Sequence, residues 1–193
     1  MPLSERWPLP DATDARDALL AAYAHPARRY HDTRHLTEVL DRLDELPDRF
    51  DRLEVTLAAW FHDGVYDGGP GAEERSAQWA SAALVDRDPA LAAEVARLVR
   101  LTETHRPADD DPNGCALSDA DLAILAAPPE RYAEYVAAVR EEYAHVPDDA
   151  FRSGRTAILA DLLARPHLFH TAYAREHWEA PARRNLTAEL AAP

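Results

Sequence analysis

Residues 58–67 read Ala-Ala-Trp-Phe-His-Asp-Gly-Val-Tyr-Asp, an apolar run that ends in a histidine and an aspartate before a glycine. The residues before Asp63 predict a helix buried on all sides, because nearly every position toward its end is apolar. Burying His62 and Asp63 next to each other costs free energy unless both side chains find partners. A bound divalent cation would satisfy both, so the rest of the chain must be searched for further ligands.

The composition predicts a single all-α domain. The chain has 193 residues, 47% of them hydrophobic, with 15 prolines and 6 glycines. This length is enough for one sizeable core, so we expect residues 1–193 to form one domain. No alternating strand pattern of useful length appears, whereas helical patterns separated by proline recur. The expected helices cover residues 11–23, 33–46, 51–61, 73–85, 88–101, 118–125, 128–143, 148–164 and 178–190.

The charge and the single cysteine exclude several classes of protein. A net charge of −14 argues against a nucleic-acid polymer as partner, because neutralising phosphates needs clustered basic residues. Cys115 is alone, which excludes an internal disulfide and a zinc cluster of thiolates. No apolar run approaches the roughly 20 residues of a membrane helix. The first ten residues do not resemble a signal peptide, so we expect a cytoplasmic protein without a membrane partner. A homodimer remains open.

Four polar residues lie on or beside apolar helix faces: His35, His62, Asp63 and Asp121. Ala59, Ala58 and Val55 lie three, four and seven residues before His62 on the same helical face, so its ring is predicted to point into the core. Each residue has a structural alternative: a core histidine is more often hydrogen-bonded than a ligand, Asp63 can simply end a helix, and Asp121 can form a capping box with Ser118. Four such coincidences together favour a common site.

Two imidazoles and two carboxylates form a mixed nitrogen and oxygen ligand set. Such a set suits Mn²⁺, Fe²⁺, Co²⁺, Ni²⁺ or Zn²⁺ with positions left for water and substrate, and Mg²⁺ is a further option. A cation of this kind polarises a phosphoryl oxygen and activates water. The residues therefore predict metal-assisted hydrolysis.

The order of these four residues resembles the signature of the HD-domain superfamily of metal-dependent phosphohydrolases, which is a histidine, an adjacent His-Asp pair and a distant aspartate. The resemblance covers nearly the whole chain. It implies an all-α, single-domain helical bundle in which His35, His62, Asp63 and Asp121 bind one divalent metal ion. The segments similar to a bacterial, mostly uncharacterised subgroup are 30–35 (YHDTRH), 61–67 (FHDGVYD), 117–122 (LSDADL), 154–155 (GR) and 182–186 (ARRNL).

The resemblance also suggests catalytic residues. Glu73 matches the place of a catalytic acid, although Ala72 replaces the asparagine that usually precedes it, and a glutamate in a first helical turn is the alternative. Asp63 or Glu73 would accept the proton of the attacking water. His105 is the only histidine between the His-Asp pair and Asp121, which favours one metal. It is a candidate proton donor to the leaving group, or else a solvated loop residue.

An anionic substrate needs local positive charge. Arg155 lies within an apolar helical stripe, and its planar fork matches phosphate, but a buried Asp or Glu as its partner is the alternative, which the sequence slightly favours. Arg140 is a second candidate for phosphate binding. His31 precedes His35 by four positions and can face the same pocket, support it from behind or face solvent.

The sequence thus predicts a metal-dependent phosphohydrolase that acts on a small phosphate ester, with a nucleotide as the favoured example. Phosphatase, phosphodiesterase and pyrophosphohydrolase activities are not separable at this level. Two alternatives are a nucleotide-binding regulatory HD module with little or no turnover and a purely structural helical protein.

Overall fold

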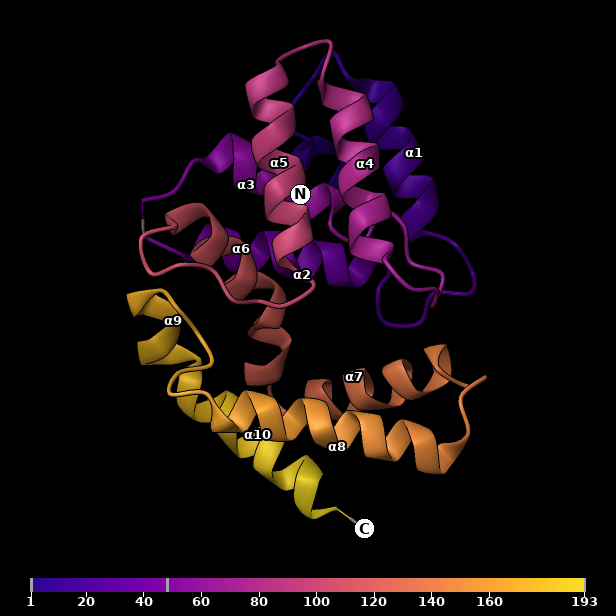
Figure 1. Ribbon diagram of the computed structural model, residues 1–193, viewed down its shortest axis with the longest axis vertical. Coiled ribbons are helices and arrows are strands. Elements are labelled where there is room, and N and C mark those ends of the chain that lie inside the picture. The colour runs from indigo at the N-terminus through magenta and orange to yellow at the C-terminus, as the bar shows by residue number, and fades with distance from the viewer. Residues whose placement is uncertain (1, 48, 193) are drawn as a thin grey trace.

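The computed structural model describes residues 2–47 and 49–192, and within these residues it contains helices and no strand. The all-α class expected from the sequence is confirmed (Figure 1). The described helices are η1 (Leu3–Arg6), α1 (Thr13–Tyr23), α2 (Thr33–Glu45), α3 (Arg52–Phe61), α4 (Ala72–Leu84), α5 (Pro89–Leu101), α6 (Pro112–Leu122), η2 (Ala123–Ala126), α7 (Pro129–Glu142), α8 (Asp148–Ala164), α9 (Ala172–His177) and α10 (Glu179–Ala191), where η marks a 3-10 helix.

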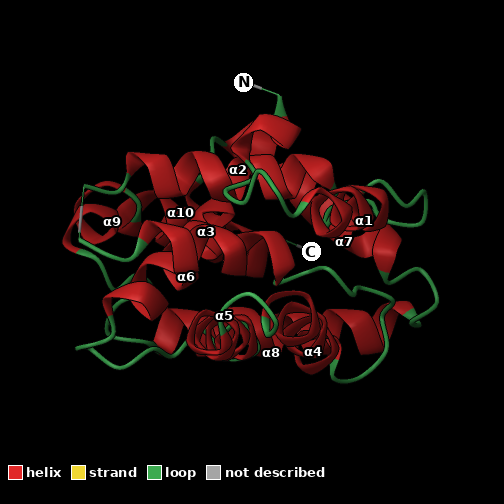
Figure 2. Ribbon diagram, turned by 90° about the horizontal axis from the view of Figure 1, so that it is seen from above, coloured by secondary structure: helices red, strands yellow, loops and turns green. Residues whose placement is uncertain are grey.

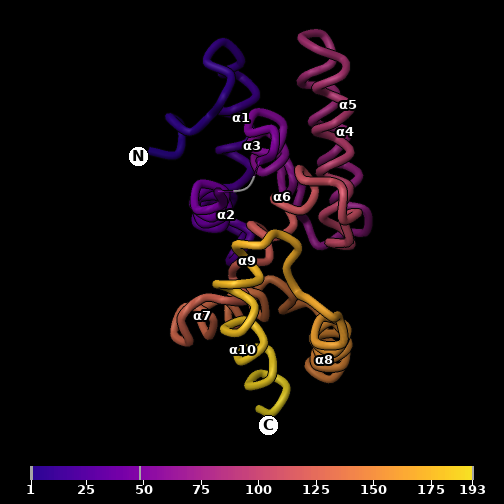
Figure 3. Tube along the Cα trace, turned by 90° about the vertical axis from the view of Figure 1, so that its left-hand side faces the viewer, coloured from indigo at the N-terminus to yellow at the C-terminus, as the bar shows by residue number. Residues whose placement is uncertain are grey.

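The helices fall into two groups along the long axis of the molecule. Helices α1 to α6 form the upper part of the molecule in Figure 1, and α7 to α10 lie below them. The long pair α4 and α5 packs side by side, and α10 contacts η2, α8 and α9. Seen from above, α5, α8 and α4 lie on one side of α3 and α6, and α2 lies on the other (Figure 2). Figure 3 shows α7, α8 and α10 in the lower part of the molecule, with α8 to one side of the other two.

Helix α3 is the buried centre that residues 58–67 predict. Trp60 and Phe61 are fully buried, and Trp7 packs edge-to-face on Trp60 with ring centroids 5.2 Å apart. The helix contacts α2, α4, α5 and α6. Burying large side chains such as these contributes about 2 kcal/mol each, so α3 anchors the core from which the site is built.

Aspartate caps begin several helices. Asp51 and Asp88 accept backbone N–H groups at the starts of α3 and α5, as their sequence positions predict. Asp32, one residue before the expected start of the second helix, accepts the N–H groups of Arg34 and His35 at the start of α2. Asp11, at the expected start of the first helix, does not cap α1, and its carboxylate pairs with Arg87 instead.

Helix α6 differs most from expectation. It begins at Pro112 with Asp111 as its cap, whereas the sequence suggested a loop to Gly114 and a helix from Ser118. Proline suits the first helical position because its fixed φ fits the helix and its missing N–H is not needed there. Ser118 is therefore buried inside the helix, and the capping box with Asp121 does not form. The structural alternative for Asp121 thereby loses its basis.

Two further features of the fold are a short helix before α10 and the limited apolar length of the helices. The short helix α9, in a segment left without a firm prediction, is capped by Thr171 and leads into α10. None of the described helices combines the length and the apolar character needed to cross a bilayer.

Candidate metal centre

His62 sits at the C-terminal end of α3 with its ring turned inward. Its backbone N–H still bonds to Ala58, and its Nδ1 lies 2.8 Å from the carbonyl oxygen of Ala59. A proton on Nδ1 donates to that carbonyl and leaves Nε2 with a lone pair, which is how metal-ligating histidines are commonly oriented. Only 2% of the residue is exposed, so Nε2 must find its partner inside the protein.

Gly64 allows the chain to turn immediately after the His-Asp pair. A Cβ at this position would lie 3.0 Å from the Trp79 ring and 3.1 Å from the carbonyl oxygen of Phe61. These contacts are tighter than ordinary van der Waals contact, so a side chain at this position would require its neighbours to shift by a few tenths of an ångström. The same turn holds Asp63 beside the end of the helix.

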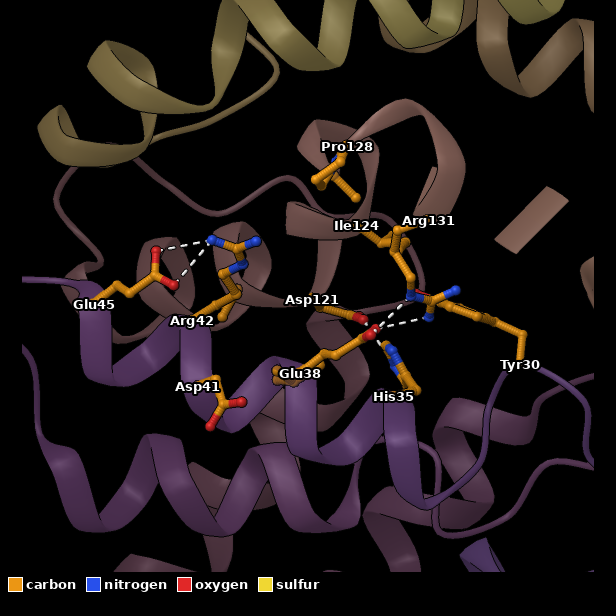
Figure 4. Close-up of a pocket in the computed structure, with 13 residues that line it drawn as sticks. Tyr30, His35, Glu38, Asp41, Arg42, Glu45, Asp121, Ile124, Pro128 and Arg131 are labelled. Atoms are coloured by element: carbon orange, nitrogen blue, oxygen red, sulfur yellow. Dashed lines mark hydrogen bonds and ion pairs between the residues drawn. The ribbon is translucent and has the colours of Figure 1, made fainter. Parts of the chain in front are cut away.

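His35 approaches from α2 and meets the other three predicted ligands. Its Nε2 lies 3.1 Å from Nε2 of His62, 3.3 Å from Oδ2 of Asp63 and 3.2 Å from Oδ1 of Asp121. Figure 4 shows the His35 ring next to the Asp121 carboxylate, which comes from the end of α6. Three different helices thus bring these side chains together.

The donor atoms surround a common point. His62 Nε2 lies 3.0 Å from Oδ2 of Asp63 and 3.6 Å from Oδ1 of Asp121. One donor atom from each of His35, His62 and Asp121 lies within 4.8 Å of the others, a spacing that one ion can bridge. Asp63 Oδ2 is buried and lacks a hydrogen-bond partner among the described residues. Such an orphaned oxygen fits a metal site, because buried carboxylate oxygens otherwise require a donor.

Without a cation, the cluster balances its charge with protons. Burial lowers the pKa of His35, but the adjacent carboxylates of Asp121 and Asp63 outweigh it and raise the pKa to about 10. The pKa of His62 is also raised, since the two carboxylates outweigh its burial. The pKa values of Asp63 and Asp121 fall well below their usual range, because the attraction of the imidazoles outweighs burial. The cluster therefore has a strong demand for positive charge.

His105 joins the edge of this cluster. Its Nδ1 lies 3.2 Å from the hydroxyl of the buried Ser118, and its Nε2 lies 3.6 Å from Oδ2 of Asp121. Its backbone has φ of 50°, which is uncommon for a residue with a Cβ and marks a strained position. Burial lowers the pKa of His105, so the ring is neutral at pH 7. The sequence alternative of a solvated loop residue does not describe this position.

The carboxylates form part of the wall of a cavity of about 920 Å³. Asp63, Asp121, His105, His31 and Glu73 all line it, whereas the candidate ligands His35 and His62 do not. A second, smaller pocket of about 180 Å³ is lined by His35 on α2 and by Asp121 at the end of α6 (Figure 4). With Arg155, six of the predicted site residues thus line one cavity.

Glu73 occupies the first turn of α4 and also lines the large cavity. Both readings of this residue, a helix-dipole glutamate and a catalytic acid, are therefore compatible with its place.

The two arginines predicted to bind phosphate, Arg155 and Arg140, differ in their position relative to the cavity. Arg155 lines the cavity, but its guanidinium forms two hydrogen bonds with the Glu189 carboxylate, at 2.8 and 3.1 Å, and one with the hydroxyl of Tyr135. The alternative of a buried acidic partner is therefore the one found. Arg140 is not among the residues that line the cavity, and it donates to the carbonyl oxygens of Tyr143 and Val146. Its place at the end of α7 argues against the predicted substrate role.

His31 lines the cavity from a fixed position. Its ring stacks on Tyr66 with centroids 3.9 Å apart, and its Nδ1 lies 2.7 Å from Oε2 of Glu142. Glu142 also accepts the backbone N–H groups of residues 29, 30 and 31. Burial raises the pKa of Glu142, but the His31 hydrogen bond and these N–H groups outweigh it and lower the pKa to about 2.

Arg28 was not singled out by sequence reasoning, yet it holds the two site loops together. Its guanidinium donates to the carbonyl oxygens of His31, Asp63 and Gly64, at 2.9, 2.7 and 2.9 Å. Glu142 was missed in the same way. Both residues act on backbone groups distant in sequence, and a charged residue in a loop or at a helix end carries no local sign of such a role.

Comparison with family models, curated proteins and solved structures finds no match for this chain. The resemblance to the HD-domain superfamily therefore rests on the motifs quoted above.

Proposed function

We propose that this protein is a metal-dependent phosphohydrolase of the HD-domain type that acts on a small phosphate ester. The observation that carries the proposal is the convergence of His35, His62, Asp63 and Asp121 beside a cavity large enough for such a substrate. A binding cavity of this size with buried titratable groups in its wall is the usual setting of an active site. The same arrangement would be costly in a purely structural protein, because it buries two carboxylates.

The residues suggest a division of roles. His35, His62, Asp63 and Asp121 would hold one divalent cation, which supplies Lewis-acid polarisation of a phosphoryl oxygen and activation of water. Asp63 or Glu73 would accept the proton lost by the attacking water. His105 would donate a proton to the leaving oxygen, since an anionic substrate beside it raises its pKa from the lowered value of the free protein.

Supporting residues keep these groups in place. Ser118 holds the ring of His105 through Nδ1, and Glu142 holds His31 with its Nε2 edge available to the cavity. Arg28 ties the Asp63 loop to the His31 loop through their carbonyl oxygens. Such positioning matters because small displacements of catalytic groups reduce rates strongly.

The test combines metal analysis with an activity screen. Protein purified without chelator is analysed for bound metal, then assayed on nucleotides and small phosphate esters with Mn²⁺, Fe²⁺, Co²⁺, Ni²⁺ and Zn²⁺. Asp63→Ala should abolish metal-supported turnover, whereas Asp67→Ala, an exposed carboxylate four residues later that pairs with Arg75, should not. Absence of bound metal after supplementation would overturn the proposal.

A second candidate, a nucleotide-binding HD module with little turnover, has one observation in its favour. The Arg155 charge is occupied by Glu189, so no strong phosphate clamp is evident at that place. Tight ligand binding without turnover across the whole panel would support the module over the enzyme.

A further inference from the structure

Much of the wall of the large cavity is apolar. Its apolar residues come from the end of α6, from η2, from α7 and the residue after it, and from α8: Leu122, Leu125, Val139, Tyr143, Phe151 and Ile158. The carboxylates of the candidate metal centre, which follow α3 and lie at the end of α6, line the same cavity. The cavity therefore combines carboxylates with an apolar surface that lies mainly on η2, α7 and α8.

Helix α8 contributes to this wall with a face that is unusually open. Ile158 is 56% exposed, more than the other large hydrophobic residues found exposed among those described. Gly154 lies one turn before it, and a Cβ there would meet nothing within 4 Å. Ala150 and Ala157 line the same cavity. Small residues beside an exposed isoleucine leave room that an apolar ligand group would fill.

The cavity offers little fixed positive charge. Three arginines line it, and each has an acidic partner among the described residues: Arg155 pairs with Glu189, while Arg106 and Arg165 share Asp161. A polyphosphate chain needs several unpaired cations to replace its hydration. These contacts disfavour a nucleoside triphosphate, whereas one phosphate group can be met by a metal ion and the two histidines of the wall.

From these three observations we infer that the substrate is a phosphate ester with a single phosphate group and an uncharged aryl or alkyl body that lies against η2, α7 and α8. This inference rests on the proposed function and narrows its substrate class. The volume of about 920 Å³ is within the range of cavities that enclose molecules of this size. Removing the apolar body from water would supply most of the binding free energy.

The first test measures binding without turnover. The probe is 1-naphthyl phosphate, titrated calorimetrically into the metal-free Asp63→Ala protein, with glycerol phosphate as the ligand that has the same anionic group and no apolar body. We expect naphthyl phosphate to bind at least about tenfold more tightly than glycerol phosphate, because burying one apolar group changes the affinity by about that factor. Equal affinity for the two ligands would overturn the inference.

Two variants locate the bound group. Ile158→Asp should weaken naphthyl phosphate binding by about tenfold or more, whereas Val85→Asp, an exposed aliphatic residue at the end of α4 outside the cavity, should have no effect. Gly154→Leu should also weaken binding, because its side chain enters the open space, and its better helix propensity protects the fold. Thermal unfolding confirms that each variant folds. Unchanged binding in both cavity variants would refute the location.

The two proposals fail in different ways. If no metal supports turnover but naphthyl phosphate binding depends on Ile158, the phosphohydrolase is refuted and the apolar subsite stands. If the metal-loaded enzyme hydrolyses glycerol phosphate as efficiently as naphthyl phosphate, with the same kcat/KM in Ile158→Asp, the phosphohydrolase stands and the substrate class inferred here is refuted.

Discussion

Binding of a divalent metal to the cluster of His35, His62, Asp63 and Asp121 should release protons and should weaken steeply as the pH falls. In the metal-free protein the two carboxylates outweigh burial and raise the pKa of His35 to about 10, so its ring is protonated at pH 7. A protonated imidazole cannot bind a metal. At pH 7, which is 10 − 7 = 3 units below this pKa, a metal ion must first displace the proton from His35. The apparent metal affinity is therefore about three orders of magnitude, or about 4 kcal/mol, weaker than that of the protein with deprotonated His35.

The direction and the steepness of the pH dependence of metal binding follow from the pKa of His35. One displaced proton makes the apparent association constant rise about tenfold for each pH unit until the pH approaches 10. The pKa of His62 is raised as well, so a second displaced proton would steepen the dependence at lower pH. Calorimetric titration of Mn²⁺ at pH 6, 7 and 8, in two buffers of different ionisation enthalpy, gives both the affinity and the number of protons released.

The control for this experiment is His167→Gln, which changes an exposed histidine outside the cluster and should leave the proton count unaltered. His35→Gln should remove both the metal affinity and the proton release. The reasoning would be refuted by an affinity that depends on His35 but does not change between pH 6 and 8.

Three further changes test the supporting structure by urea denaturation. Arg28→Met removes three hydrogen bonds to carbonyl oxygens and should lower the free energy of unfolding by about 3 kcal/mol. Glu142→Gln should cost about 2 kcal/mol at pH 7. Because the pKa of Glu142 is lowered from 4.5 to about 2, its contribution is present above pH 4.5 and is lost as the pH falls toward 2, so the difference from wild type should shrink at pH 3. Gly154→Ala should raise stability by about 0.5–1 kcal/mol, since helix α8 has open space there.

Neighbouring residues provide matched controls for these three variants. Arg29→Met and Glu141→Gln alter an exposed ion pair next to the critical residues, and each should change stability by less than about 0.5 kcal/mol. Gly71→Ala should destabilise, because Gly71 has φ of 69°. Equal effects of Arg28→Met and Arg29→Met would show that the three carbonyl contacts contribute nothing.

Much of the fold could be predicted because its signals are local. Apolar residues at helical spacing, prolines at helix starts and aspartate caps indicated where α3, α5 and α7 begin. The start of α6 was missed because its first turn, Pro112 to Gly114, is polar and reads as a loop until Asp111 is seen to cap it. Local sequence patterns predict where helices occur better than where they end, because a neighbouring polar residue can cap a helix in place of the expected one.

The candidate site shows the same division. The four proposed metal ligands were recognised by type, by order along the chain and by their places on apolar faces, and the structure brings them together from α2, α3 and α6. The partner of Arg155 could not be predicted, because Glu189 is 34 positions away on α10. Arg28 and Glu142 act on carbonyl and N–H groups distant in sequence, which leave no periodic pattern to read.

The sequence by itself determined the all-α class, the burial of α3 and the residue types that favour a metal centre, because periodicity, capping and ligand chemistry are properties of neighbouring residues. Only the tertiary structure decided that His105 and His31 share a cavity with Asp63 and Asp121, and that apolar residues of α7 and α8 line the same cavity. It also decided that the cavity arginines are already paired with acids. These facts depend on how helices far apart in the chain pack, and no local pattern encodes that.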